Sequence, residues 1–417
     1  MEFVRSNHQK EKNQCKKLII SIMIAMLAFL FAVQASANEP DGNSVEAIEN
    51  THDEAFDSLV HEQMDSLELE NIKKFWDSIA TEYGGFLPES QKVSFLDFVK
   101  GDKSFSFQQW LIGGLKFLFY ELIANGKLLG TLILLAVFAA VLQTIQNAFE
   151  FHTVSKVAYS ITFMVLIIIA LNSFHIAVTY AEEAIQNMMN FMIALIPLLL
   201  ALLASLGNLA SVGFFHPMIV FLINTSSLLI VKLVLPLLFL SAILLVVSSL
   251  TEHYKVTKLA NLLRNVGLGI LGVFFAIFLG VISIQGASSA VADGVTIRTA
   301  KFFAGNFIPV VGRMFTDATD AIMSASLLLK NMIGLAGVVI LLLLAFFPAV
   351  KVLAISLIFH IAGAILQPLG AGPIVESLDV IGKSILYIFV ALAVVSFMFF
   401  LTITIMIGIG NAAYMMR

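Results

Sequence analysis

The chain has 417 residues, of which 59% are hydrophobic and only 12% are charged, a composition that excludes a soluble globular protein. Several runs of about 18 or more apolar residues indicate transmembrane helices. Acidic residues dominate positions 38–110, with 16 acidic against 5 basic, whereas positions 111–417 hold 10 acidic and 14 basic residues. No clustered basic surface indicates nucleic-acid binding. We therefore predict an all-α, polytopic transmembrane helical bundle.

Residues 1–37 have the pattern of a secretory signal peptide. A lysine-rich start precedes an apolar run over residues 18–33, and Ala35-Ser36-Ala37 has the small-residue form of a cleavage site. The alternative is an uncleaved signal anchor. Both place residue 38 onward outside the cytoplasm. The only cysteine, Cys15, lies in this leader, so a processed chain would contain no thiol.

Residues 38–110 are predicted to form an acidic extracytoplasmic segment, which we call the head. Apolar residues recur at helical spacing over residues 56–79, and Tyr83–Pro88 is predicted to end the helix. About 70 residues hold little core of their own. We expect the head to dock on the membrane domain or on a partner; the alternative is a solvated spacer.

The membrane domain, residues 111–417, is predicted to contain about seven to nine spans. Residues 111–126 are apolar but carry charges, which favours an interfacial helix. The predicted single spans are 128–149, 157–180, 188–206, 266–285, 331–350, 352–369 and 384–410.

Residues 214–250 are too long for one span, so we predict a hairpin of two short spans divided at Lys232 and Pro236. Lys232 would then extend to the interface from the hairpin tip. The hairpin places the basic segment 251–265 in the cytoplasm, as cationic loops require. Lys351 is interpreted as a cytoplasmic turn, and Arg417 ends the chain on the same side.

An internal repeat is possible. Pro197 and Pro309 are separated by the same 112 residues as Pro236 and Pro348. Many transporters contain duplicated halves, but nine prolines offer many chance pairs, so both readings stay open.

Residues 286–330 form a polar stretch between apolar spans, predicted as a helix–kink–helix motif. Lipid-exposed irregular backbone is excluded there, because its polar groups would have no partners. The motif is interpreted as lining a passage or contacting a partner; the alternative is an amphipathic helix in the headgroups. The candidate passage-lining or partner-contact residues are Asp293, Arg298, Lys301, Asn306, Arg313, Asp317 and Asp320, and the helix break is assigned to Gly305, Pro309 and Gly312.

Enzyme signatures are missing from the sequence. It contains no G-x-x-x-x-G-K-[ST] phosphate loop, no H-E-x-x-H and no G-x-S-x-G. We therefore predict a protein that is not an enzyme, with no catalytic residue, cofactor or metal. His175 and His360 lie in predicted spans and are interpreted as helix–helix hydrogen-bonding residues rather than as a proton relay.

The run SSAVADGVTIRTAKFFAGNFIPVVGRMFTDATD, residues 288–320, closely resembles the stage III sporulation protein AE family of endospore-forming bacteria. The resemblance extends to the leader, the acidic segment and the polytopic body. It implies a place in a channel complex that joins the mother cell to the engulfed forespore. The implied partners are the other proteins of the stage III sporulation A operon (a secretion-type ATPase, ring-forming proteins and small membrane proteins) and, through them, forespore stage II sporulation protein Q.

The resemblance also implies a location in the mother-cell-derived membrane around the forespore, with the head in the intermembrane space. It brings no catalytic residues. Two rival functions remain open at this point. One is a stand-alone secondary transporter, and the other is a scaffold for the ring proteins that conducts nothing.

Overall fold

The computed structural model describes residues 69–87, 95, 107–148, 153–250, 255–307, 311–369 and 372–415, without the side chains of residues 285–321. Every element in these ranges is helical, which confirms the all-α class. All of these elements belong to one compact unit, Ser58–Arg417. The predicted leader and the first part of the head lie outside the described residues.

The longest helices are far longer than a single membrane crossing needs. Helix α7 runs over Thr153–Ser205, α10 over Thr257–Phe307, α11 over Val311–Leu366 and α12 over Pro373–Met415. At 1.5 Å per residue the 53 residues of α7 extend about 80 Å, against roughly 30 Å for the hydrocarbon core of a bilayer. Five described helices are long and apolar enough to cross a membrane, or up to six if one bent pair counts as a span.

Two predicted interruptions are wrong, because the chain stays helical through them. The predicted spans 157–180 and 188–206 are parts of α7, and 331–350 belongs with most of 352–369 to α11. Lys351 therefore lies within a helix and not in a turn. Glutamate and lysine are good helix formers, so a charge that interrupts an apolar run does not interrupt the backbone hydrogen bonds. The predicted number of seven to nine spans is not confirmed.

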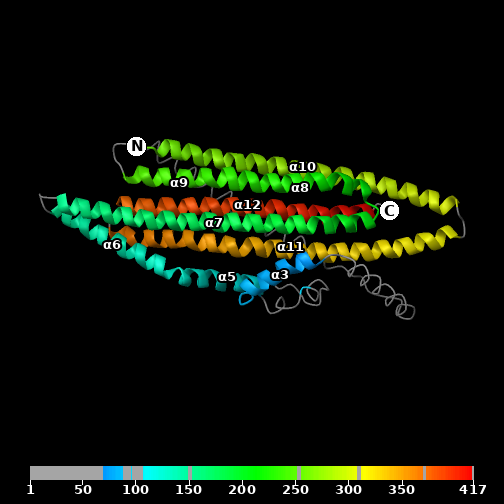
Figure 1. Ribbon diagram of the computed structural model, residues 1–417, viewed down its shortest axis with the longest axis horizontal. Coiled ribbons are helices and arrows are strands. Elements are labelled where there is room, and N and C mark those ends of the chain that lie inside the picture. The colour runs from blue at the N-terminus through cyan, green and yellow to red at the C-terminus, as the bar shows by residue number, and fades with distance from the viewer. Residues whose placement is uncertain are drawn as a thin grey trace. The chain divides into compact units, whose positions relative to one another are not determined.

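The predicted hairpin in residues 214–250 is also wrong. Helix α8, Leu209–Leu229, passes through a short π-helix, η2, Ile230–Val234, into α9, Leu235–Leu250, along one line (Figure 1). The side chain of Lys232 is exposed on the side of this helix rather than at a hairpin tip.

Pro236 explains the π-helix. Proline has no N–H, and its ring displaces the carbonyl four residues before it, here that of Lys232. The N–H of Leu235 instead bonds to the carbonyl of Ile230, five residues back. The wider turn absorbs the proline without ending the helix.

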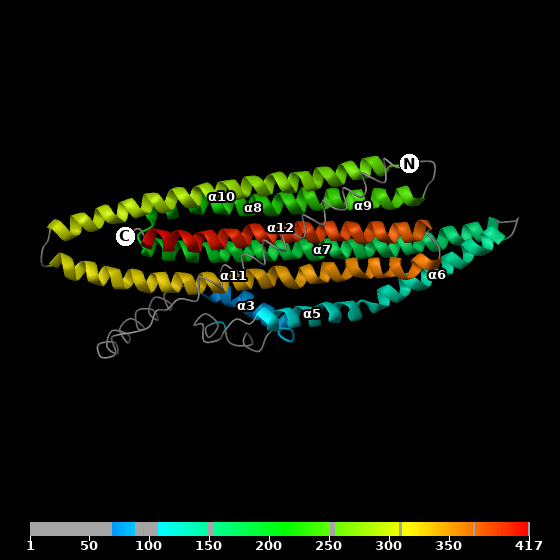
Figure 2. The ribbon, with the colours of Figure 1, turned by 180° about the vertical axis from the view of Figure 1, so that it is seen from behind.

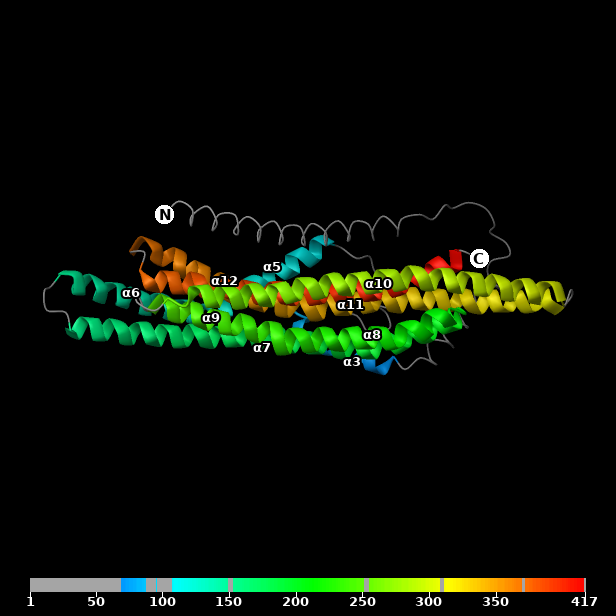
Figure 3. The same ribbon diagram turned by 90° about the horizontal axis from the view of Figure 1, so that it is seen from above.

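Three helices form the centre of the bundle. Helices α7, α11 and α12 all contact one another, and α10 packs on α9 and α12 beside them (Figures 1 and 3). Fully buried aromatic side chains fill the contacts, among them Phe174 and Phe191 of α7, Phe359 of α11 and Phe399 of α12. Burial of such side chains is the main stabilising contribution.

Two shorter helices lie on the outside of α7 and α11. Helix α5, Phe107–Ala124, and helix α6, Gly126–Ala148, meet at Asn125 with a bend of 47°. The Asn125 amide donates to the Glu121 carbonyl at 2.9 Å and ends α5 locally. A helix was expected over residues 111–126 and is present, but α5 and α6 are long and apolar enough for a membrane span only when taken together. Its position at the membrane interface stays a prediction.

Helices α10 and α11 extend past the ends of α7, α8 and α12 (Figures 1 and 2). The helical backbone ends at Phe307 and begins again at Val311. The predicted helix–kink–helix range thus contains the end of α10 and the start of α11, and residues 308–310 between them lie outside the described residues. Gly305 lies within α10 and Gly312 within α11, while Pro309 lies outside the described residues.

Glycine at position 337 permits the close approach of α11 and α7. A Cβ atom there would lie 2.6 Å from Cδ2 of Leu195, which is fully buried. We predict that Gly337→Ala lowers the free energy of unfolding by about 1–3 kcal/mol, the usual cost of overpacking. The thermal unfolding midpoint of the detergent-solubilised protein measures this.

The matched control is Gly272→Ala on α10, where an added Cβ meets no atom within 4 Å. It should gain about 0.4–1 kcal/mol, because alanine restricts the unfolded chain. Equal effects of the two substitutions would contradict the assigned packing.

Candidate functional site

The sequence-predicted site residues lie on the projecting parts of α10 and α11. The first group is on α10 and the second on α11: Asp293, Arg298, Lys301 and Asn306, followed by Arg313, Asp317 and Asp320. The positions of their side chains are outside the described part of the structure, so their assigned role stays a prediction. The two helices bring both groups to the same end of the bundle (Figure 1).

A second candidate site lies where the head meets the bundle. Helix α3, Glu70–Tyr83, packs on α7 and α11. We call this contact the docking site; it consists of Phe75, Trp76, Glu82 and Tyr83 of α3, Phe117 of α5, Tyr180 and Phe191 of α7, and Phe347 and Lys351 of α11. This packing confirms, for residues 70–83, the expected docking of the head on the membrane domain.

The sequence of α3 explains why one face docks. Ile72, Trp76, Ile79 and Tyr83 recur at spacings of three and four residues, and all four are buried. This spacing places them on one side of the helix. The opposite side carries the exposed ion pair between Lys74 and Glu70, at 3.1 Å. Helix α3 therefore presents an apolar face to the bundle and a charged face to water.

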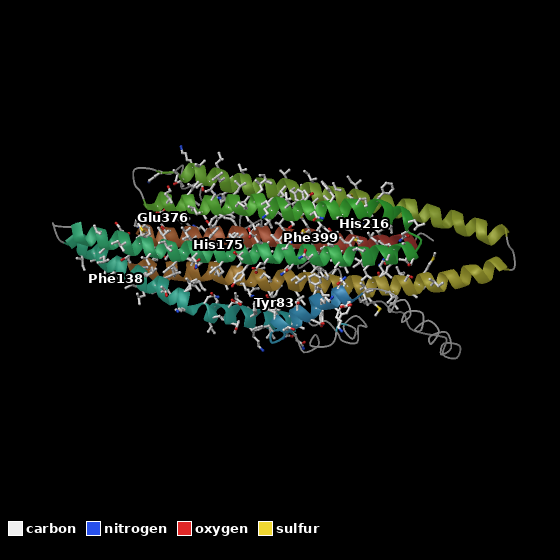
Figure 4. The ribbon with its side chains drawn as sticks, viewed as in Figure 1. Tyr83, Phe138, His175, His216, Glu376 and Phe399 are labelled. Atoms are coloured by element: carbon white, nitrogen blue, oxygen red, sulfur yellow. The ribbon has the colours of Figure 1, made fainter. Side chains whose placement is uncertain are left out.

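Aromatic rings form the core of the docking site. The Tyr83 ring stacks on Phe347 with centroids 4.0 Å apart and planes 5° apart (Figure 4). Phe117 meets both rings edge-on, at 5.7 Å from Tyr83 and 5.0 Å from Phe347. At the other end of α3, Phe75 meets Phe191 edge-on at 5.3 Å. The ring geometries are those that aromatic pairs prefer.

Lys351 connects three segments that are distant in sequence. Its Nζ donates to Glu82 Oε1 at 3.1 Å and to the Tyr83 hydroxyl at 3.2 Å. The same ammonium lies 5.1 Å from the centroid of the Tyr83 ring and 5.5 Å from that of Tyr180. A cation between a carboxylate and two aromatic rings is satisfied on several sides at once. Lys351 thus holds α3 against α7 and α11.

The electrostatics of the site keep Tyr83 neutral. Burial raises the pKa of the Tyr83 hydroxyl far above its usual range, and the hydrogen bond with Glu82 raises it further. The phenol consequently stays protonated at all physiological pH values, and its oxygen remains an acceptor for Lys351. The arrangement binds and orients a helix.

Helix α5 reaches the site through two glycines. A Cβ at Gly114 would lie 2.6 Å from the ring of Phe346, and one at Gly113 would lie 2.4 Å from the carbonyl oxygen of Phe86. Only glycine allows α5 this close to α11 and to the segment after α3. This contact places Phe117 edge-on against both Tyr83 and Phe347.

Lys330 is a second lysine with a specific environment. Its side chain is fully buried, and its Nζ donates to the Ile407 carbonyl and to Asn411 Oδ1 of α12, both at 2.8 Å. It lies near the point where α11 leaves the bundle. Because oxygens of α12 satisfy the ammonium, Lys330 fixes the end of α12 to the base of the projecting helices.

The sequence analysis missed three residues of these contacts. Lys351 was assigned to a turn, Tyr83 to a helix break and Lys330 to the end of the polar helix–kink–helix motif. The available signal was a lone lysine inside an apolar run, which needs partners at whatever depth it lies. Nothing in the sequence identified Glu82 and Tyr83 as those partners.

Of the two histidines, only His360 forms a polar contact with another helix among the described residues. His175 is exposed, and its ring lies 6.2 Å from Phe239 (Figure 4). His360 pairs through Nδ1 with the Ser356 carbonyl of its own helix, at 2.8 Å, while Nε2 lies 4.0 Å from Asp379 of α12. In the described ranges, no group of three or more His, Cys, Asp or Glu side chains could hold a metal ion.

Truncating Tyr83 should detach α3 from the bundle. We predict that Tyr83→Ala removes about 3 kcal/mol of the docking free energy, as loss of a buried aromatic ring does. Hydrogen exchange of the α3 amides should accelerate accordingly. The control, Lys74→Ala, breaks only an exposed ion pair. It should change the opening free energy obtained from the exchange of the α3 amides by less than about 0.5 kcal/mol. Unchanged protection in Tyr83→Ala would refute the docking.

Lys351 and Glu82 should be coupled energetically. In a double-mutant cycle of Lys351→Met and Glu82→Gln, we expect a coupling of about 1 kcal/mol, because the pair is partly exposed and shared with the Tyr83 ring. The readout is again the exchange protection of α3. Strictly additive effects would show that the two side chains do not interact in solution.

Comparison with known proteins agrees with the resemblance found in the sequence. The family model for stage III sporulation protein AE matches residues 90–410. The stage III sporulation protein AE of Bacillus subtilis (strain 168) is 59% identical over 395 residues, which cover 95% of this chain and 98% of that protein. No solved structure matches the chain. The long apolar helices, the docked head helix and these matches together show that the chain belongs to the stage III sporulation protein AE family.

Proposed function

We propose that this protein is a membrane component of the channel or secretion complex between mother cell and forespore, acting after engulfment. Family membership and the 59% identity with the Bacillus subtilis protein support a role in sporulation. The long apolar helices support a place in a membrane. The channel and its location are our proposal, in line with the resemblance described above.

The observation that carries the proposal is the projecting pair of helices. Their polar, charged sequence continues from apolar bundle helices at one end of the molecule (Figure 1). A polar extension of this kind suits contact with a partner subunit or the wall of a passage. In the proposed role the protein forms or supports the passage, without catalysing a reaction and without a cofactor.

The proposed partners are the other stage III sporulation A-operon proteins, with stage II sporulation protein Q on the forespore side. The proposed location is the mother-cell-derived membrane, with the head in the intermembrane space. The docking site supports this arrangement, because it holds a charged helix of the head on the bundle and leaves the charged face of α3 free. That face is available to an extracytoplasmic subunit.

We predict that Arg313→Ala or Asp317→Ala impairs sporulation after engulfment while the protein stays in the membrane. Loss of either charge alters the polar surface that, in our proposal, lines the passage or contacts a partner. Heat-resistant spore counts measure the effect, and immunoblots of the membrane fraction check the amount of protein.

Lys383→Ala is the control, because this half-exposed side chain pairs with Asp379 of its own helix, α12, and belongs neither to the projecting helices nor to the docking site. It should sporulate normally. Normal spore counts for both Arg313→Ala and Asp317→Ala would remove the projecting helices from the mechanism. Solute uptake by the purified protein alone in liposomes would instead support the stand-alone transporter.

A further inference from the structure

A polar face lies in the middle of the apolar helix α7. Its polar residues share one side of the helix with the exposed Ile176, lie at spacings of three, four, seven and eleven residues, and are exposed or half-exposed: Asn172, His175, Thr179, Glu183, Gln186, Asn187 and Asn190. At 1.5 Å per residue this face extends about 27 Å. We call it the α7 polar face.

The same side of α7 is apolar before and after this face. Ile161, Met164 and Ile168 are exposed on the preceding turns, and Ile193 follows it. All of these residues belong to the apolar stretch Val157–Ser205. The polar face is therefore a local feature, and its carboxylate and amides would be costly against lipid.

Few partners within the chain satisfy these groups. Gln186 Nε2 donates to Asn190 Oδ1 at 3.2 Å, so both belong to the face itself. In the described part of the chain, no Lys or Arg side chain forms an ion pair with Glu183. Groups left in this condition need water or another subunit.

Helix α3 provides an independent marker of hydration at the same level. Its Phe75 meets Phe191 of α7, and Lys351 places Tyr83 next to Tyr180. Helix α3 therefore runs beside α7 from Tyr180 to Phe191, the part that carries Glu183 and the following amides. Its outer side holds the exposed Lys74–Glu70 pair, and charged groups of this kind favour water over lipid at that level.

We propose that the α7 polar face is in contact with water in the assembled protein and forms one wall of a passage for hydrated polar solutes. The other walls come from further copies of this chain, since a closed ring of identical subunits turns the same face toward its axis. Exposed side chains on other helices include apolar ones, such as Phe221 of α8, Ile277 of α10 and Leu335 of α11, and isolated polar ones, such as His216 and Asn224 of α8. The passage rests on the proposed function; the hydration of the face does not.

The test is cysteine labelling of the full chain in opened membranes of sporulating cells, in a Cys15→Ser background. Asn172→Cys, Glu183→Cys and Asn190→Cys probe the polar face, and Phe221→Cys, Ile277→Cys and Leu335→Cys are matched exposed controls. A small membrane-impermeant reagent should modify the face roughly tenfold faster than the controls, since the reacting thiolate forms only in water. A maleimide carrying bulky polyethylene glycol should not reach the face.

A second readout tests the neighbouring copies. A short bifunctional maleimide should cross-link Glu183→Cys to itself in a second copy, whereas His216→Cys, exposed on α8 (Figure 4), should stay monomeric. Equal labelling of face and controls would overturn the inference. Reaction with the bulky reagent would show an open surface instead of a passage wall, and absence of the cross-link would exclude identical copies as the other walls.

The outcome is separable from that of the proposed function. A Glu183→Leu, Gln186→Leu variant removes the polarity of the face. If the face labels as expected while this variant gives normal spore counts, hydration stands and the passage is refuted. If the face does not label, the inference fails, while the role in sporulation keeps its own support.

Discussion

Backbone hydrogen bonding in apolar surroundings is the constraint on which this structure depends. A polypeptide with few charges and long apolar runs cannot leave N–H and C=O groups unpaired, and a helix pairs them within one segment. The chain therefore continues as a helix through positions that interrupt its hydropathy. Even Pro236 only shifts the bonding pattern by one residue, because the π-turn before it restores a partner for the Leu235 N–H.

Polar side chains inside such helices must then find partners where they lie. Lys351 finds a carboxylate, a hydroxyl and two rings by drawing α3 onto the bundle. Lys330 finds oxygens of α12 and fixes the base of the projecting helices. Glu183 has no such partner among the described residues. Lys330 and Lys351 therefore have a structural role, whereas the α7 polar face, which carries Glu183, needs water or another subunit.

The parts that sequence reasoning predicted correctly follow from local chemistry. Helix α3 has apolar residues at helical spacing, and these residues are buried where it packs on the bundle. The errors concern continuity and distant contacts. Hydropathy records where charges lie but not whether the helix ends there, since Glu and Lys maintain helices. The hydrogen-bonding partners of Lys351, Glu82 and Tyr83, lie more than 260 residues away in the sequence, beyond any local pattern.

The continuous helices also change the end of the bundle at which the last helix, α12, finishes. Joining 157–180 to 188–206 removes one predicted crossing, and replacing the hairpin by α8–α9 removes another. These two changes cancel, so the sequence-based prediction that the basic segment containing Lys255 and Lys258 faces the cytoplasm is not altered by them. Joining 331–350 to 352–369 has no such compensation. The end of α12 consequently lies at the end of the bundle opposite to this basic segment (Figure 1), next to the projecting helices. Lys330 bonds α12 at that end, so the contact that fixes the projecting helices belongs to the side where the head is predicted, and not to the cytoplasmic side expected for the chain end.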